Sequence, residues 1–402
     1  MEADDVLLTQ RFLPEHGGSI RWMHEVYRRW PRPVHVITHD YYGHAPRIPE
    51  FPDVPERPPS GDHVDDANLT VERRDIFFHD WGLQSPANVG RYWRMTRAVR
   101  PRTGPGRRLV VHCTHVLPEV FSLLPLCWGR RRCRIVCYAH GEEITACESS
   151  RQLRFMMRRA YARVDVLLAN SRYTADLAAQ YVPDERIHIV HPGVDTDEFE
   201  AADEAGRAWR RQHGYEDRFV VLTVGRLDPR KNQAAVLEAT RRLAERFPEI
   251  LYVVAGEGRE LDRLRESAED PALAGRVIFT GPVDGALKRA LFGACDVFAM
   301  PAIRDGTDVE GFGIVFLEAG ACGKPVIAGR VGGQADAVED DRTGLIVDGT
   351  DHAAVTDALA RLRGDADLRR RCGAEGRARA LDHRWSRVVE RTVGIVETLR
   401  AS

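Results

Sequence analysis

The feature that most constrains the fold is an alternation, repeated twice along the chain, between short β-branched apolar runs and longer stretches with helical patterning. Such alternation is typical of parallel strands joined by helices that cover both faces of a sheet. The expected strands are 6–12, 34–38, 69–77, 109–115, 134–139, 165–169 and 187–191 in the first series, and 219–224, 250–255, 277–280, 297–300, 325–328 and 344–347 in the second. The sequence therefore predicts an α/β protein with two Rossmann-like sheets.

The length of the chain supports the same division, because 402 residues exceed what one hydrophobic core usually supports. A polar, alanine-rich segment at 195–217 separates the two series of strands. We therefore place an N-terminal domain at 1–195 and a C-terminal domain at 196–384, and we expect the proline-rich stretch 42–66 to be a surface excursion. Ligands of open α/β sheets bind outside the carboxyl ends of the strands, so two such domains facing each other would form a ligand-binding cleft.

The composition excludes some classes of function. The 58 basic and 60 acidic residues leave a net charge of −2, which does not point to nucleic acid as a partner. The acidic start of the chain precedes an apolar run too short for a signal peptide or a membrane span, so we expect a cytoplasmic protein. The eight cysteines form no CxxC pair, which favours buried free thiols over a zinc site.

The positive charge is unevenly distributed. Between Arg91 and Arg172 there are seventeen arginines and five carboxylates, and three of the arginines, at 130–132, follow an apolar stretch at 121–128. This pattern suits peripheral contact with the anionic headgroups of a membrane or with an anionic acceptor. Solvated helix faces in an arginine-biased protein are the alternative interpretation, and both stay open at the level of the sequence.

The strongest local signal is the segment from Glu310 to Glu318, in which two carboxylates flank a Gly-x-Gly turn that opens an apolar helix. Burying the Glu318 carboxylate without a partner would be costly, and ribose hydroxyls would be suitable partners. Glu310 would receive the hydroxyls of a transferred sugar, while the glycines would let the backbone approach phosphate oxygens. The alternative is a capping acid followed by a salt-bridged helix acid.

A second signal is the loop after the expected strand 219–224, which carries Arg226 and Lys231. Two cations at this position would clamp a diphosphate, and Lys231 is one of only three lysines in the chain. Near the N-terminus, Gly17 and Gly18 lie between a strand and a helix, where backbone amides face phosphate. An exposed pair of cations and a plain capping turn are the respective alternatives.

His140 ends the expected strand 134–139. An imidazole at the carboxyl end of a strand can reach a substrate hydroxyl or stabilise developing charge. A lone histidine is also common as a structural residue, so position alone leaves its role open.

Together these segments resemble the large retaining glycosyltransferase family 4, whose members have the GT-B fold. The matching motifs are Gly17-Gly18, Tyr138-Ala-His-Gly-Glu142, Asn170-Ser171, His191-Pro-Gly-Val-Asp195, Gly225-Arg-Leu227, Lys231-Asn232, Ala255-Gly-Glu-Gly258 and the stretch from Glu310 to Val326. The segment 301–313 is similar to a subgroup of actinobacterial mannosyltransferases that act on phosphatidylinositol mannosides and related lipids.

The resemblance implies a role for each candidate residue. A donor site would lie mainly in the C-terminal domain, and the terminal helix 385–402 would cross back to the N-terminal domain. The implied donor-site residues are Arg226 and Lys231 on the diphosphate, Glu318 on the ribose, Glu310 with the backbone of Gly311, Phe312, Gly313 and Ile314 on the sugar and phosphates, Gly17 and Gly18 approaching the diphosphate, Val283 near the base, and His140 on the transferred sugar.

The implied function is the transfer of a hexose, with retention of configuration, from GDP-mannose or a UDP-sugar to a hydroxyl of a lipid, saccharide or small-molecule acceptor. Neither a metal nor another cofactor is expected, because the two cations would stabilise the departing diphosphate. The alternatives are a sugar-nucleotide epimerase and a non-catalytic member that keeps the donor pocket. The pairing of Arg226 and Lys231 with Glu310 and Glu318 favours the transferase.

Overall fold

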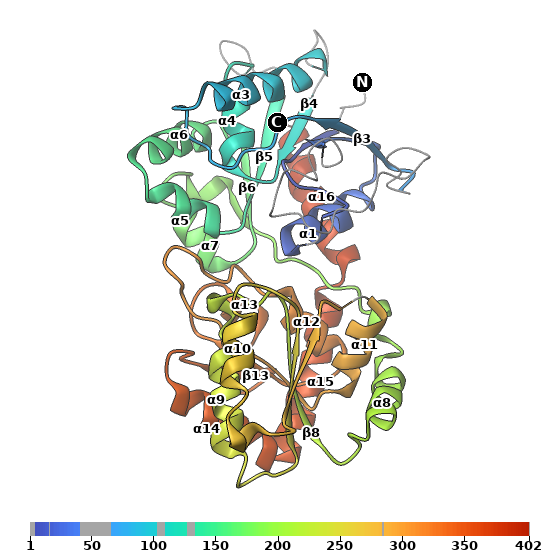
Figure 1. Cartoon of the computed structure of the whole chain (residues 1–402). Helices are drawn as coiled ribbons and strands as arrows, with labels where there is room; N and C mark the ends of the chain where they lie inside the picture. The colour runs from blue at the N-terminus through green and yellow to red at the C-terminus, as the bar shows by residue number, and fades with distance from the viewer. Residues whose placement is uncertain are drawn as a thin grey trace. The chain divides into compact units, whose positions relative to one another are not determined.

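The computed structural model describes residues 5–15, 17–40, 66–102, 109–126, 133–283 and 285–401. The chain forms two compact units (Figure 1). The N-terminal unit is Met1–His191 together with Trp385–Ser402, and the C-terminal unit is Pro192–Arg384. The first strand of the C-terminal unit begins after this division, at Phe219.

The N-terminal unit is built on a seven-stranded sheet in the order β3-β2-β1-β4-β5-β6-β7, and each neighbouring pair of strands is parallel. The strands are β1 (Asp5–Leu8), β2 (Val34–His39), β3 (Leu69–Arg74), β4 (Leu109–Cys113), β5 (Cys133–Ala139), β6 (Val166–Ala169) and β7 (Ile187–Ile189). All seven predicted strands of the first series are thus present, but β1 is shorter than the predicted 6–12. β1 ends because the Thr9 hydroxyl donates to the Arg11 carbonyl oxygen and accepts from the Arg11 backbone N–H. A local turn thereby replaces the hydrogen bonds between neighbouring strands.

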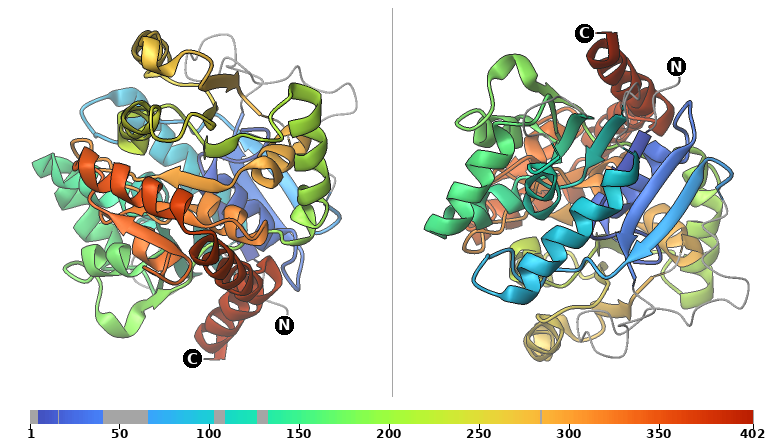
Figure 2. Two further views of the ribbon diagram at one scale, coloured as in Figure 1. Left: turned by 90° about the horizontal axis from the view of Figure 1, so that it is seen from below. Right: turned by 90° about the horizontal axis from the view of Figure 1, so that it is seen from above.

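Helices cover both faces of this sheet (Figures 1 and 2). They are α1 (Gly18–Tyr27), α3 (Pro86–Val99), α4 (Phe121–Leu123), α5 (Glu142–Glu148), α6 (Arg151–Tyr161), α7 (Arg172–Ala178) and α16 (Trp385–Ala401). Successive residues of β4 point to opposite faces. Val111 packs in a cluster with residues of α3 and α6, whereas Val110 packs with residues of α1 and α16. The C-terminal helix therefore belongs to the N-terminal unit, as the resemblance predicted.

The C-terminal unit has a six-stranded parallel sheet in the order β10-β9-β8-β11-β12-β13. Its strands are β8 (Phe219–Val224), β9 (Ile250–Ala255), β10 (Val277–Gly281), β11 (Val297–Met300), β12 (Val326–Gly329) and β13 (Gly344–Val347). Its helices are α8 (Ala202–His213), α9 (Gln233–Leu243), α10 (Leu261–Ser267), α11 (Gly285–Ala294), α12 (Ile314–Ala321), α13 (Gln334–Ala337), α14 (His352–Gly364) and α15 (Ala366–Asp382). The second predicted series of strands is confirmed to within a residue or two at each end.

The core of the C-terminal unit also has two layers. Leu222 of β8 packs with residues of α8, α11 and α12, and the neighbouring Val221 packs with residues of α9, α14 and α15. Because helices bury both faces, every residue of β8 and β9 is buried. This explains why these strands are continuous apolar runs in the sequence. It also leaves the ends of the strands as the places where polar groups gather.

Helices α8 and α11 touch through their backbones at a pair of glycines. A Cβ added at Gly293 would lie 1.7 Å from the Ala202 carbonyl oxygen, and one added at Gly206 would lie 2.2 Å from the Gly293 carbonyl carbon. Any side chain at either position would therefore push the two helices apart.

We predict that Gly293→Ala lowers the free energy of unfolding by about 1–3 kcal/mol, because overpacking against backbone atoms cannot be relieved by a side-chain rotation. Urea denaturation, monitored by circular dichroism, measures this free energy of unfolding. The matched control is Gly394→Ala in α16, where an added Cβ meets nothing within 4 Å and the higher helix propensity of alanine raises stability by up to about 1 kcal/mol. Equal effects of the two substitutions would contradict the close helix contact.

A buried carboxylate ties the first strand to the last helix. Asp5 at the start of β1 accepts hydrogen bonds from His112 Nε2 and Trp30 Nε1, each at 3.0 Å, and from Arg400 of α16. Burial raises the pKa of Asp5, but the hydrogen bond and charge of His112 and the charge of Arg400 outweigh it and lower the pKa to about 2.

The lowered pKa of Asp5 predicts how stability changes with pH. Because the folded pKa of about 2 is below the unfolded value of 3.8, the contribution is fully present above pH 4 and is lost as the pH falls through 2. We expect Asp5→Asn to lower the free energy of unfolding by about 2 kcal/mol at pH 7. The difference from the unmodified protein should shrink as the pH is lowered from 5 toward 2. A difference that does not change over this range would mean that Asp5 acts through packing alone.

Candidate functional site

The loop after β8 is anchored at the carboxyl edge of the C-terminal sheet. A 3₁₀ turn at Pro229–Lys231 leads to Asn232, which has a left-handed backbone with φ of 59°. The Asn232 side-chain amide donates to the carbonyl oxygens of Pro301, at 3.0 Å, and Gly349, at 2.7 Å. These bonds connect the loop to the segments that follow β11 and β13, so Lys231 is held at the edge where ligands of parallel sheets bind.

Lys231 and Glu310, both predicted for the donor site, are in direct contact. Lys231 Nζ and Arg230 Nη1 both donate to Glu310 Oε2 at 2.5 Å. Arg230 Nε also lies 3.0 Å from Asp308 Oδ1. Burial raises the pKa of Glu310, but the charges of Lys231 and Arg230 outweigh it and lower the pKa to about 2. Glu310 is therefore an ionised, buried hydrogen-bond acceptor at neutral pH.

The residues after Glu310 start a helix. Gly313 has φ of 90°, and a Cβ there would meet the Phe316 ring at 2.6 Å. Helix α12 begins at the next residue, Ile314, and its first turn carries backbone N–H groups without intrahelical partners. The Phe312 side chain is buried in the core, so Phe312 and its neighbours Gly311 and Gly313 offer backbone amides rather than side chains. This is the arrangement that binds phosphate oxygens in other proteins.

Glu318, on the buried side of α12, has a partner within the protein. Lys288 Nζ of α11 donates to Glu318 Oε1 at 2.6 Å. The structure thus meets the need for a partner that the sequence indicated, but it does so with a lysine. Its predicted contact with ribose stays a prediction.

Two other predicted donor residues lie outside these ion pairs. The Arg226 side chain is 68% exposed and its Nε lies 2.8 Å from Asp228 Oδ2, so in this structure it is not gathered with Lys231 and Glu310. Val283, after β10, packs against the same hydrophobic cluster as Phe312 and Ile314.

In the N-terminal unit, His140 directly follows β5 and is buried. Its Nε2 lies 3.1 Å from the Thr114 carbonyl oxygen, and because a carbonyl only accepts, we assign the ring proton to Nε2. Burial, together with the neighbouring His115, lowers the pKa of His140 to about 3. The neutral ring therefore offers Nδ1 as an acceptor, which favours contact with a hydroxyl over stabilisation of negative charge.

A network that sequence reasoning missed surrounds His140. The buried Glu119 carboxylate accepts from His115 N at 2.7 Å and from Thr114 Oγ1 at 2.8 Å. Glu143 Oε1 accepts from His140 N at 2.8 Å, and burial raises the pKa of Glu143. The His115 ring lies 5.0 Å from the His140 ring. The network holds the backbone that positions His140.

Gly17 and Gly18 start α1. Gly17 is the N-cap of α1 and Gly18 its first residue, both are exposed, and the first turn of the helix contains no acidic side chain. The same helix places Trp22 against His140, with ring centroids 5.5 Å apart. The start of α1 is therefore an open helix N-terminus on a helix that also packs against His140, which suits an anion.

Arg230 and Lys288 are the main residues that the sequence did not reveal in the C-terminal unit. The scarcity of lysine was a usable signal, since Lys231 and Lys288 are two of the three lysines and both bind predicted site carboxylates. No such signal marked Arg230 among so many arginines.

Several other expectations can be compared with the structure. Seven cysteines are buried and free as predicted, while Cys127 lies outside the described residues, as do the arginines at 130–132. Within the described ranges, no cluster of three or more histidine, cysteine or acidic side chains is placed to hold a metal ion. None of the described helices is long and apolar enough to cross a membrane.

Family models match both units. The model described as Glycosyltransferase Family 4 matches residues 16–198, and the model described as Glycosyl transferases group 1 matches residues 207–379. The first covers the segments that contain His140 and Gly17. The second covers those that contain Lys231, Glu310 and Glu318.

Two curated proteins illustrate the similarity. A GDP-mannose-dependent alpha-(1-6)-phosphatidylinositol monomannoside mannosyltransferase of Mycolicibacterium smegmatis is 39% identical over 62% of this chain and 66% of that protein, just under two thirds of its length. A GDP-mannose-dependent monoacylated alpha-(1-6)-phosphatidylinositol monomannoside mannosyltransferase of Corynebacterium glutamicum is 33% identical over 66% of this chain and 70% of that protein.

The crystal structure of Anabaena HepE in complex with UDP is similar over 99% of this chain and 100% of that chain, with a TM-score of 0.78 and 18% identity. This likeness confirms the two Rossmann-like domains of the GT-B fold. Because a relative 33% identical is matched over 70% of its length and family models match both units, the chain belongs to glycosyltransferase family 4.

Proposed function

We propose that the protein transfers a sugar from a nucleoside-diphosphate sugar to a hydroxyl of a lipid or saccharide acceptor. The observation that carries the proposal is the buried contact of Glu310 with Lys231, next to the N-terminus of α12. A cation for the diphosphate, an ionised acceptor for sugar hydroxyls and free backbone amides are thereby gathered in one unit. The C-terminal unit is accordingly proposed as the donor domain and the N-terminal unit as the acceptor domain.

The proposed chemistry is mainly electrostatic. Breaking the bond between the sugar and the diphosphate places negative charge on the departing phosphate, which Lys231, Arg226 and the first amides of α12 would stabilise. Lys231 would turn from Glu310 toward the phosphate when the donor binds. Arg230 would stay paired with Glu310, and the remaining acceptor positions of the Glu310 carboxylate would bind sugar hydroxyls. His140 would accept from another sugar hydroxyl through Nδ1.

We further propose that the anomeric configuration is retained and that no metal is required. The family resemblance supports retention. The charge that a metal would supply can come from Lys231, Arg226 and the N-terminus of α12. GDP-mannose is the first donor to test and a phosphatidylinositol mannoside the first acceptor, because the mannosyltransferases of Mycolicibacterium smegmatis and Corynebacterium glutamicum are named for them.

The donor site can be tested by titration calorimetry with GDP, UDP and ADP. We expect one nucleotide to bind selectively, and Lys231→Met to weaken that binding by about 10- to 100-fold, because a charge-assisted bond to the diphosphate is lost. The control is Arg242→Met, which removes another cation paired with a carboxylate, on the exposed side of α9. Unchanged affinity of Lys231→Met would contradict the assigned site, and equal loss in both variants would point to a nonspecific charge effect.

We also propose that the N-terminal unit makes peripheral contact with anionic membrane. Helices α3 and α6 both adjoin α4 and both expose large apolar side chains. Trp93 and Val89 of α3 are 52% and 50% exposed, and Phe155 of α6 is 57% exposed beneath the Arg159 guanidinium. Arginines line both helices, at 91, 94 and 97 on α3 and at 151, 154, 158 and 159 on α6. Apolar side chains among arginines suit an anionic interface.

Co-sedimentation with vesicles tests this membrane contact. We expect binding to vesicles with anionic lipid, weaker binding at high salt, and a reduction of about tenfold for Trp93→Ala combined with Phe155→Ala. Leu381→Ala in α15, which removes an exposed apolar side chain from the C-terminal unit, serves as control and should bind as the unmodified protein does. Binding that ignores anionic lipid content would rule the contact out.

A further inference from the structure

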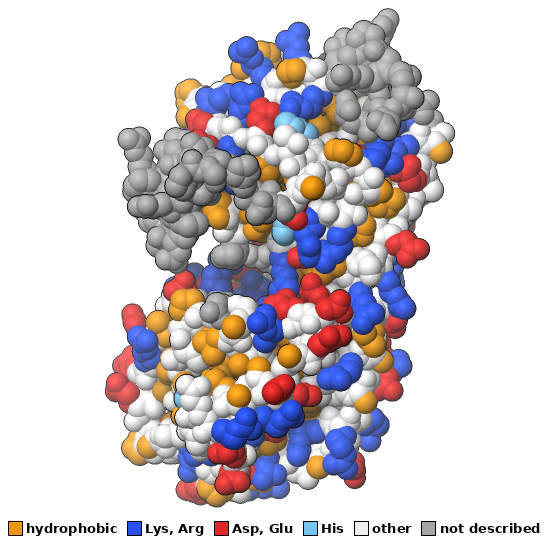
Figure 3. Space-filling model, turned by 90° about the vertical axis from the view of Figure 1, so that its right-hand side faces the viewer, with side chains coloured by type: hydrophobic (Ala, Val, Ile, Leu, Met, Phe, Trp, Pro, Cys, Tyr) orange, Lys and Arg blue, Asp and Glu red, His pale blue; other side chains and the backbone are white. Residues whose placement is uncertain are grey.

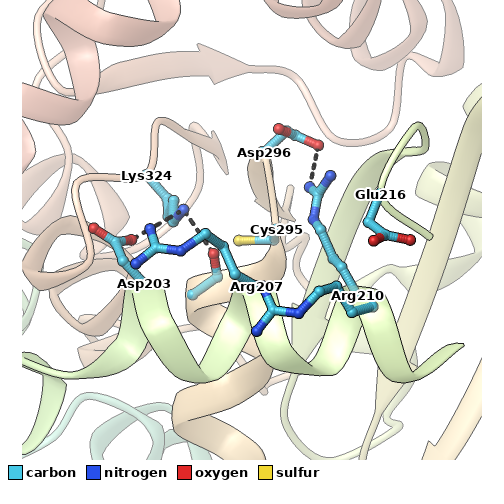
Figure 4. A pocket seen from close by; sticks show the side chains of 9 residues that line it. Asp203, Arg207, Arg210, Glu216, Cys295, Asp296 and Lys324 are labelled. Atoms are coloured by element: carbon cyan, nitrogen blue, oxygen red, sulfur yellow. Dashed lines mark hydrogen bonds and ion pairs between the residues drawn. The ribbon is translucent and has the colours of Figure 1, made fainter. Parts of the chain in front are cut away.

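The C-terminal unit contains a pocket of about 400 Å³ that none of the predicted donor residues lines. Its lining residues are Asp203, Arg207, Arg210, Arg211, Glu216, Gly293, Cys295, Asp296 and Lys324 (Figure 4). They come from α8, the end of α11 and the segments just before β8, β11 and β12. The pocket thus lies at the amino edge of the sheet, whereas Lys231 and Glu310 follow the carboxyl ends, about 20 Å away along β8.

One wall of the pocket is fixed by satisfied charges. Arg210 donates to the Ala294 carbonyl at 2.7 Å, to the Arg218 carbonyl at 2.9 Å and to Asp296 Oδ2 at 2.6 Å. Lys324 Nζ donates to the Gly293 carbonyl at 2.8 Å and lies 3.6 Å from Asp203 Oδ1. Because the glycine contact also locks α8 to α11, the pocket is held by the fold rather than by loose side chains.

Two further cations of the pocket are uncommitted. Arg207 and Arg211 are four residues apart on α8, so they share one face of the helix. Neither side chain has a hydrogen bond or ion pair to any residue that the structure describes. Figure 4 shows the Arg207 and Lys324 side chains reaching toward the same part of the pocket, next to the Asp203 carboxylate, while Arg210 reaches Asp296.

The charges of the lining favour an anion. The positive charge of Arg210 is balanced by Asp296, and that of Lys324 by Asp203. Of the remaining charged groups in the lining, Arg207 and Arg211 are positive and only Glu216 is negative. On the side of this unit that carries α8 and α11, basic and acidic side chains are interspersed (Figure 3). Attraction to the pocket therefore comes from these particular guanidinium groups rather than from a broad positive surface.

We propose that this pocket binds a phosphate dianion, either free or carried by a small phosphorylated molecule. A guanidinium presents a planar fork of donors that matches phosphate oxygens, and Arg207 and Arg211 supply two such forks. Lys324, which is paired with Asp203, lies beside them in the lining of the pocket. The volume is in the range of small-molecule sites, which leaves room for a group attached to the phosphate. This site is separate from the donor site and does not depend on the proposed transferase activity.

Thermal unfolding of the full chain tests the proposal, with inorganic phosphate and glucose 6-phosphate as the probes and sodium chloride at equal ionic strength as the reference. A ligand that binds the folded state raises Tm, and we expect a rise of about 2 °C or more. The rise should disappear in Arg207→Gln combined with Arg211→Gln. It should persist in Arg370→Gln combined with Arg371→Gln, which removes two exposed arginines from α15, and in Lys231→Met.

Each of the following outcomes either supports or overturns the proposed phosphate site. A rise with both probes shows that the phosphate group alone is bound, and a rise with glucose 6-phosphate only assigns a phosphomonoester. A rise that Lys231→Met abolishes and the Arg207 and Arg211 substitutions leave intact would place the anion at the donor loop and overturn the proposal. No rise, or an equal rise with sodium chloride, would overturn it as well.

Discussion

The Glu310 carboxylate is buried and ionised, and this is possible only because Lys231 and Arg230 donate to the same oxygen. An unpaired charge at this depth would cost several kcal/mol or would be neutralised by a proton. The three residues are brought together by two loops from separate strands, β8 and β11, which neighbour each other in the sheet. The geometry of the candidate donor site therefore follows from the order of the strands.

A second constraint is that both sheets are parallel and covered by helices on both faces. Polar groups then have room only at the strand ends, and the two ends of the C-terminal sheet are used differently. The carboxyl ends carry Glu310, Lys231 and the start of α12. The amino ends carry the pocket lined by Arg207 and Lys324. In the N-terminal unit the same rule places His140 and its network of buried carboxylates after β4 and β5.

Much of the fold was predictable, because apolar runs that are buried on both sides have a pattern that the sequence displays directly. The strands of both sheets were anticipated in this way, whereas the packing of α16 on the N-terminal unit was implied by the resemblance to the family. The extent of β1 was not, since a single hydroxyl, that of Thr9, ends the strand by bonding Arg11.

The candidate site was predictable only in part. The pairing of Lys231 with Glu310 joins two motifs that sequence spacing marked. The ion-pair partners of the two carboxylates could not be predicted, because they come from residues far apart in the chain. Lys288 of α11 pairs with Glu318 of α12, and Arg230 pairs with Glu310 only once the two loops are folded. The neutral state of His140 likewise depends on burial and on His115.

The central claim is that these groups serve sugar transfer. It is tested most directly by following the release of GDP from GDP-mannose by the full chain, with and without vesicles that contain a phosphatidylinositol mannoside, in the presence of a metal chelator. The account predicts release that requires the acceptor, persists with the chelator and falls at least about tenfold in Glu310→Gln, where the ionised acceptor of sugar hydroxyls is lost. Release that is independent of acceptor, or equal in Glu310→Gln and the unmodified protein, would contradict it.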